Sequence, residues 1–165
     1  MGGVMQQQIA IQDLIPNNHC YGCGTQNELG LQIKSYWQSE IEAHCDFQPS
    51  HHHCAGPTHF LNGGIISTII DCHCVCMAIA KGYQMKGQPV GQGEPVWFAT
   101  GNLNLSFLKP VLITSNVSLK AKITEVHEKK IVIRCELYSQ QDLCCQAEVI
   151  AVKVPNEWFI GESSN

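Results

Sequence analysis

The strongest constraint on the fold is one uninterrupted apolar segment from Ile65 to about Ala80. It contains neither glycine nor proline and is the only long helix candidate in the chain. On a helical wheel its apolar face is broad, and the opposite stripe holds small or polar residues: Ser67, Thr68, Asp71, Cys74, Val75 and Ala78. A helix this apolar must be nearly enclosed, with His73 as a neutral core histidine. Lys81 and Gly82 predict its last turn and its C-cap.

Strand-like segments flank this helix on both sides. Two precede it and four follow it, and most alternate apolar and polar residues with the period of two that is typical of half-buried strands. They span residues 31–37, 41–47, 98–107, 117–124, 131–138 and 143–154. One helix cannot cover both faces of a sheet, which excludes a parallel α/β fold. The order predicts an α+β fold in which an antiparallel sheet wraps around one long central helix, with an edge that a second copy would cover.

Length and composition bound the class of protein. The chain has 165 residues, of which 44% are hydrophobic and 15% charged, and its net charge is −4. This fits a single domain, with a leader over residues 1–30, a core over 31–154 and a tail over 155–165. The charge gives no reason to expect nucleic acid or a membrane as partner. No apolar run approaches the roughly 18 residues of a membrane span, and the N-terminus lacks the pattern of an export signal, so a cytoplasmic protein is expected.

Ten cysteines raise the questions of disulfides and metals. Most lie in apolar segments, where cysteine acts as a small hydrophobic residue, and no export signal supports a disulfide framework. His19, Cys20 and Cys23 form a short knuckle, but structural zinc usually takes two short pairs of ligands. Cys72, Cys74 and Cys76 are spaced so that they point in different directions on a helix. No metal and no cofactor are therefore expected, and a zinc or redox protein is kept as a rival hypothesis.

The start of the helix carries the candidate chemistry. Asn62-Gly63-Gly64 places backbone N–H groups at a helix N-terminus, where a ligand oxygen can approach them because glycine has no side chain. Such donors suit an oxyanion that develops on an attacked carbonyl. Asp71 lies about two turns further on, and a carboxylate there is costly unless it is paired or used as a general base or nucleophile. The simpler interpretations are an N-cap for Asn62 and a structural role for Asp71.

These residues resemble the hotdog-fold thioesterases of the phenylacetate-pathway and hydroxybenzoyl-CoA type. That family has His-Gly-Gly at the start of its central helix and an Asp nine residues after the His. Asn62-Gly63-Gly64 and Asp71 match this spacing, with Asn62 in the place of the His. Further matching segments are Ala55-Gly56-Pro57, the leader from Cys20 to Leu31, and Ser106-Phe107-Leu108-Lys109-Pro110.

The resemblance implies an acyl-CoA hydrolase that works as a homo-oligomer, either a homodimer or a homotetramer. The carbonyl would be polarised at the Gly64 N–H with help from Asn62, and Asp71 of the partner protomer would activate water. Thr100 falls where some members position that water. Since asparagine cannot act as a general base, this role falls on Asp71 or on water held by a nearby histidine. The substrate-binding candidates, chosen from position and charge, are His53, His59, Ser67, Lys109 and Arg134.

Two alternatives stay open besides the zinc or redox protein. One is a hotdog dehydratase or hydratase, which typically needs a His paired with an acid at the site. The other is a non-catalytic protein that binds acyl-CoA. The sequence does not specify the acyl group.

Overall fold

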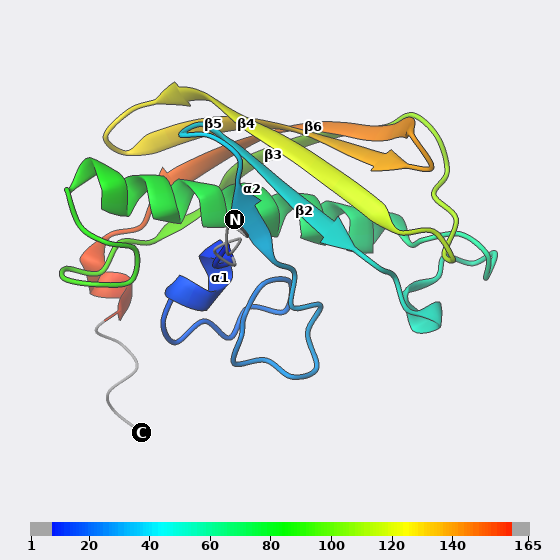
Figure 1. Ribbon diagram of the computed structural model, residues 1–165, viewed down its shortest axis with the longest axis horizontal. Coiled ribbons are helices and arrows are strands. Elements are labelled where there is room, and N and C mark those ends of the chain that lie inside the picture. Colours follow the sequence, from blue (N-terminus) through cyan, green and yellow to red (C-terminus); the bar gives the residue numbers. More distant parts are fainter. Residues whose placement is uncertain (1–7, 160–165) are drawn as a thin grey trace, which may run out of the picture.

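The computed structural model describes residues 8–159, and it shows one antiparallel sheet curved over one long helix (Figure 1). The predicted α+β arrangement is confirmed. Residues 1–7 and 160–165 lie outside the described part. The expectation that the N-terminus carries no export signal concerns the first of these segments, and the expected tail includes the second. The elements in chain order are α1 (Ile11–Leu14), β1 (Ser35–Trp37), β2 (Glu42–Phe47), the 3-10 helix η1 (His51–His53), α2 (Gly63–Met85), β3 (Phe98–Phe107), β4 (Val117–Val126), β5 (Lys130–Ser139), β6 (Asp142–Lys153) and η2 (Asn156–Phe159).

The sheet has six strands in the order β1-β2-β4-β5-β6-β3, and all neighbouring strands are antiparallel. The predicted alternation is observed on β4 and β5, where one set of side chains is buried and the other faces solvent. The buried set of β4 is Val117, Leu119, Ala121 and Ile123. Strand β3 ends the sheet on one side, so its outer backbone edge is not paired by any strand within residues 8–159.

Helix α2 is the core of the protein. Ile69, Ile70 and Met77 are fully buried, and the helix lies between the sheet and the N-terminal segment (Figure 1). By length and composition alone the helix would qualify as a membrane span, contrary to the expectation from the sequence, but 61% of the apolar window is buried inside the protein. The same composition is required of a helix that a single domain encloses.

Two boundary predictions and one prediction about the exposed face of the helix are wrong. Helix α2 continues past the expected C-cap at Gly82 to Met85, because Gly82 is buried where an added Cβ would lie 2.7 Å from both Val96 and Phe98. The first strand covers only residues 35–37 of the expected 31–37. The accessible stripe of the helix is also narrower than the wheel predicts, since Cys74 and Ala78 are fully buried.

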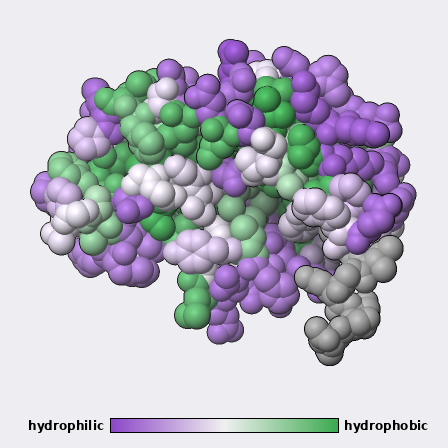
Figure 2. Space-filling view, turned by 180° about the vertical axis from the view of Figure 1, so that it is seen from behind, coloured by the Kyte–Doolittle hydropathy of each residue, from purple (hydrophilic) through white to green (hydrophobic). Residues whose placement is uncertain are grey.

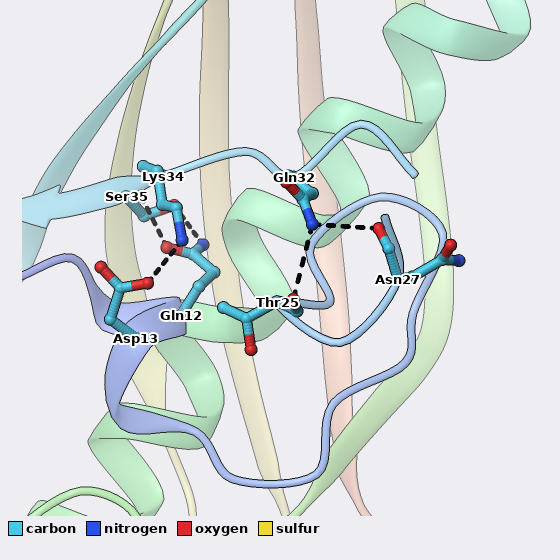
Figure 3. A network of polar contacts seen from close by, with 7 residues as sticks. All are labelled: Gln12, Asp13, Thr25, Asn27, Gln32, Lys34 and Ser35. Atoms are coloured by element: carbon cyan, nitrogen blue, oxygen red, sulfur yellow. Dashed lines mark hydrogen bonds and ion pairs between the residues drawn. The ribbon is translucent and has the colours of Figure 1, made fainter. Parts of the chain in front are cut away.

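The N-terminal segment covers the side of α2 that the sheet leaves open (Figure 1). Figure 3 shows the polar contacts that hold it: Lys34 pairs with Asp13, and the Gln32 side chain donates to the carbonyl oxygens of Thr25 and Asn27. The leader is therefore a packed part of the protein from residue 10 onward.

A buried polar chain connects this segment to the helix. The Gln12 side chain accepts from the Ser35 backbone N–H at 2.7 Å and donates to its hydroxyl at 2.8 Å. The same hydroxyl lies 2.7 Å from Nδ1 of His73, whose Nε2 is 3.4 Å from the Ala43 carbonyl oxygen. Burial lowers the pKa of His73 to about 4. The prediction of a neutral, hydrogen-bonded core histidine is confirmed.

Candidate active site

The N-terminus of α2 is capped by its own asparagine. Oδ1 of Asn62 accepts from the N–H of Gly64 at 2.7 Å and from that of Ile65 at 3.2 Å. The predicted N-cap is confirmed, and it occupies the Gly64 donor that the resemblance assigns to the substrate. The N–H of Gly63 has no hydrogen-bond partner among the described residues. In this state the free backbone donor at the tip therefore belongs to Gly63.

The loop before the helix fixes the direction of this tip. The Asn62 N–H donates to the carbonyl oxygen of His53 at 2.9 Å, and the Leu61 N–H donates to that of Val111 at 2.8 Å. One turn into the helix, the Ser67 hydroxyl donates to the Gly63 carbonyl oxygen at 2.9 Å. The predicted residue Ser67 is thus within one turn of the free donor.

A hollow of about 310 Å³ opens beside the helix tip. Helix α2 contributes Gly63 and Ile66 to its wall, and Phe107 stands at the end of β3. The Phe107 ring is so close that a Cβ on Gly63 would lie 3.4 Å from it. The remaining lining residues come from the segments before α2 and after β3: Phe60, Leu61, Leu108, Lys109, Pro110 and Val111. The tip therefore faces a shallow, mostly apolar hollow.

Asp71 and Thr100 form a pair between α2 and β3. The Thr100 hydroxyl donates to Oδ1 of Asp71 at 2.5 Å, and the Asp71 side chain is half-buried. Burial raises the pKa of Asp71, and the hydrogen bond from Thr100 opposes part of that change. The two predicted residues are brought together, in a setting that suits a base whose orientation is fixed by a neighbour.

A bulge in β3 explains how one strand supplies both this pair and the hollow. The register with β6 shifts between Thr100 and Asn102, so Gly101 is the extra residue. Before the bulge Phe98 is the buried residue of the strand, and after it Leu103 and Leu105 pack on the core. Without the shift, Leu103 and Leu105 would point away from the core while Phe98 pointed into it.

The tip and the carboxylate are separate places along one helix. Gly63 and Asp71 are eight residues apart, which corresponds to about 12 Å along an α-helix. One carbonyl carbon cannot sit against both groups of the same chain. A site that uses both must combine two copies of the helix.

The two candidate histidines have different settings. His53 is buried, and its Nδ1 accepts from the Ser50 N–H at 3.0 Å. Burial lowers the pKa of His53. His59 is exposed and its ring packs on Phe60, with 4.0 Å between the ring centroids. Neither histidine forms an ion pair with an acid in the described part of the chain.

The two candidate cations lie on different faces. Lys109 borders the hollow at the tip and pairs with Asp142 at 3.1 Å. Arg134 lies on β5 between residues that face the helix, so its side chain points to the outer face of the sheet, where it pairs with Glu148 at 3.2 Å. The structure thus brings Lys109 to the candidate site, and it does not bring Arg134 there.

A cluster of thiols was missed by the sequence reasoning. Cys20, Cys23 and Cys72 place their sulfur atoms within 4.8 Å of one another. Cys76, one turn further along α2, interacts electrostatically with Cys23. The available signal was the spacing of Cys72 and Cys76, because residues four apart on a helix share a face.

Comparison with known proteins identifies relatives of one kind. A family model described as Thioesterase superfamily matches residues 58–146, which include the helix tip, Asp71 and Thr100. Acyl-coenzyme A thioesterase THEM4 is 27% identical over 107 residues in Mus musculus and over 129 residues in Rattus norvegicus. These matches cover 64% and 76% of this chain but only 40% and 50% of those proteins, so the chain spans half or less of the length of these relatives.

Solved structures give the same result. A thioesterase superfamily protein from Shewanella loihica is 30% identical, with 84% of this chain and 96% of that chain covered and a TM-score of 0.63. The PaaI protein of the phenylacetic acid degradation operon of E. coli is 13% identical, with 76% and 81% covered and a TM-score of 0.62. At that identity the second likeness shows the fold alone.

Proposed function

We propose that this chain, which belongs to the thioesterase superfamily, hydrolyses an acyl-coenzyme A or a similar acyl thioester. The observation that carries the proposal is the pair of Asp71 and Thr100 at the boundary between the helix and the sheet edge. An acid on an otherwise apolar helix, held by one hydroxyl and still half-accessible, has the properties of a general base.

The reaction follows from these groups. Asp71 accepts a proton from a water molecule, and the water oxygen attacks the thioester carbonyl carbon. The carbon–sulfur bond then breaks, and the thiol leaves with a proton while the acyl group becomes a carboxylic acid. Thr100 acts on the base, because its hydroxyl fixes the orientation of the carboxylate through Oδ1. The residues that do this need no metal at the reacting carbon.

The carbonyl oxygen is stabilised at the tip of α2. The Gly63 N–H and the Asn62 amide NH₂ are the donors available there, since Gly64 is held by the cap. If the Asn62 side chain rotates away on binding, the Gly64 N–H joins them as the resemblance implies. The acyl chain then lies in the apolar hollow, and Lys109 at its border suits a phosphate of coenzyme A.

Two copies of the chain complete the site. The distance of about 12 Å along α2 separates the donors from the base, so Asp71 must come from the partner protomer. The edge strand β3 supports such pairing because its ten residues include no charged residue and no proline, the usual protection of a free edge. Figure 2 shows the molecule from the side opposite to that in Figure 1, and on this face hydrophobic side chains gather between hydrophilic ones.

The alternative dehydratase has less support. It requires a histidine paired with an acid, whereas Nδ1 of His53 is used by the Ser50 N–H and His59 packs on Phe60. The occupied cap at Gly64 is the one observation that favours binding without hydrolysis. The two remaining functions predict different products, so one assay separates them.

The test is release of free thiol from short, long and aromatic acyl-CoAs. Wild type is expected to hydrolyse part of the panel, and Asp71→Asn is expected to lower kcat about 10²–10⁴-fold, the range for a lost general base. Asparagine keeps the acceptor for Thr100, so packing is preserved. Asp46→Asn is the matched control, because Asp46 also accepts from a hydroxyl, that of Ser118 at 2.6 Å.

Each outcome has one meaning. If wild type binds acyl-CoA and releases no thiol, the protein is a binding module rather than an enzyme. If Asp71→Asn keeps the wild-type rate, the assigned base is wrong. Sedimentation of wild type as a monomer at the assay concentration would contradict the shared site.

A further inference from the structure

Thiols from two distant parts of the chain meet on the open side of α2. Cys20 and Cys23 come from the leader loop and Cys72 comes from the helix, with 3.6 Å between the Sγ atoms of Cys20 and Cys72. Four thiolates around zinc, each about 2.3 Å from the ion, are separated by about 3.8 Å. The observed spacing therefore fits sulfur atoms that share one cation.

A fourth thiol lies beside these three. Cys76 is fully buried, lies one helical turn after Cys72 and interacts electrostatically with Cys23, although its sulfur atom is not among those within 4.8 Å of one another. The two helical cysteines point the same way because they are four residues apart. The leader supplies a Cys-x-x-Cys pair and the helix supplies a Cys-x-x-x-Cys pair. Two short pairs are the usual composition of a structural zinc site.

The backbone of the loop is shaped around these sulfur atoms. An added Cβ at Gly22 would lie 2.3 Å from Sγ of Cys72, and one at Gly24 would lie 2.5 Å from the Cys20 nitrogen. The Gly24 N–H donates to the Cys20 carbonyl oxygen at 2.8 Å and closes the knuckle. Glycine at position 22 lets the loop approach the helix this closely, and glycine at position 24 lets the loop close on its own backbone.

Two buried amide side chains lie next to the thiols. The Asn18 side chain donates to Sγ of Cys23 at 3.4 Å and accepts from the Cys20 N–H at 3.0 Å. The Gln12 side chain reaches Cys76. Asn18 and Gln12 are both almost fully buried. Donors of this kind orient metal ligands and stabilise the negative charge of thiolates.

We propose that Cys20, Cys23, Cys72 and Cys76 bind one zinc ion that fastens the N-terminal leader to the central helix. Each thiol that binds releases its proton to solvent, and the ion holds the four sulfur atoms in a tetrahedron. A soft, all-sulfur ligand set suits zinc. Cys20 is at the surface, which gives the ion a path of entry. The expectation of no metal site is reversed by this proposal.

The site has a structural role. Four protein ligands leave no open position for a substrate or water, in contrast to catalytic zinc. The ion stands beside Asp71, the residue before Cys72, and its effect is to fix the position of the helix segment that carries this acid. It takes no part in the hydrolysis itself.

The test is the metal content of the full-length protein, purified under reducing conditions without chelator and measured by elemental analysis. About one zinc ion per chain is expected. Cys20→Ser, which changes the most exposed ligand, is expected to lose most of the zinc, and Cys54→Ser is the matched control outside the cluster. Exchange with Co²⁺ should give the sulfur-to-cobalt charge-transfer bands of a tetrahedral site in wild type and in Cys54→Ser only.

Three results would overturn the proposal. The first is less than about a tenth of a zinc ion per chain after loading with zinc, and the second is equal zinc in wild type and Cys20→Ser. The third is a Cys20–Cys72 disulfide that persists in protein purified under reducing conditions and excludes zinc. If Cys20→Ser does not fold, stepwise modification of wild-type thiols with a mercurial replaces it. Zinc must then be released as the cluster cysteines react.

Discussion

The substitution Gly63→Ala separates function from stability at the helix tip. Gly63 is the first residue of α2 and its N–H is the free donor beside the hollow. An added methyl group would meet only the Phe107 ring, at 3.4 Å, which is ordinary van der Waals contact. The helix therefore accepts alanine without a clash, but the methyl group stands where a carbonyl approaches the donor.

The substitution is expected to raise the thermal stability and to lower kcat. Alanine is favoured over glycine by up to about 1 kcal/mol inside a helix, and about half of that is expected at the first helical position. For a chain of this length, this raises Tm by roughly 1–2 °C. Loss of an oxyanion donor lowers kcat by about 10²–10³. Since the methyl group crowds the donor without removing it, a decrease of about 10- to 100-fold is expected.

Thermal unfolding and thiol release, measured on the same preparation, check both numbers. Gly56→Ala is the control, because Gly56 precedes the same helix and an added Cβ there has nothing within 4 Å. If Gly63→Ala keeps the wild-type rate at an unchanged or higher Tm, the carbonyl does not approach this donor and the reasoning is wrong.

Three further substitutions test neighbouring contacts. Thr100→Val removes the hydrogen bond to Asp71, which at about 1.5–3 kcal/mol corresponds to a loss of about 10- to 150-fold in kcat, and Thr100→Ser should restore most of it. Asn62→Ala removes an acceptor that serves two N–H groups and should lower the free energy of unfolding by about 1 kcal/mol in urea titrations. Arg134→Ala should change KM by less than about twofold, since its pair with Glu148 is exposed on the outer face of the sheet; a large rise in KM would show that this face binds substrate.

The main elements could be predicted because they depend on local periodicity. The alternation on β4 and the unbroken apolar run of α2 each identify a buried face without knowledge of tertiary contacts. The end of α2 could not be predicted, because Gly82 is a good C-cap by its local chemistry. It stays helical since Phe98 and Val96 pack against it from a later part of the chain.

The candidate site was predictable where one element carries it or where the family resemblance supplied a position. Asn62 and Asp71 belong to one helix and match the spacing of the family, the cap followed from residue type, and Thr100 on β3 followed from the resemblance. The outer-face position of Arg134 depends on which parity of β5 faces the helix. The thiol cluster joins residues about 50 positions apart, and no local pattern in the sequence relates Cys20 and Cys23 to Cys72.

The extra residue at Gly101 has a consequence for how much the β3 strand can vary. A single inserted residue lets the upstream half deliver a hydroxyl to the acid while the downstream half still turns its leucines inward. Deleting Gly101 would give a regular ladder, because Thr100 and Asn102 already pair with the consecutive residues Ala151 and Ile150 of β6. The strand can therefore lose this residue and keep both faces, whereas straightening it with Gly101 still in place would turn one half outward.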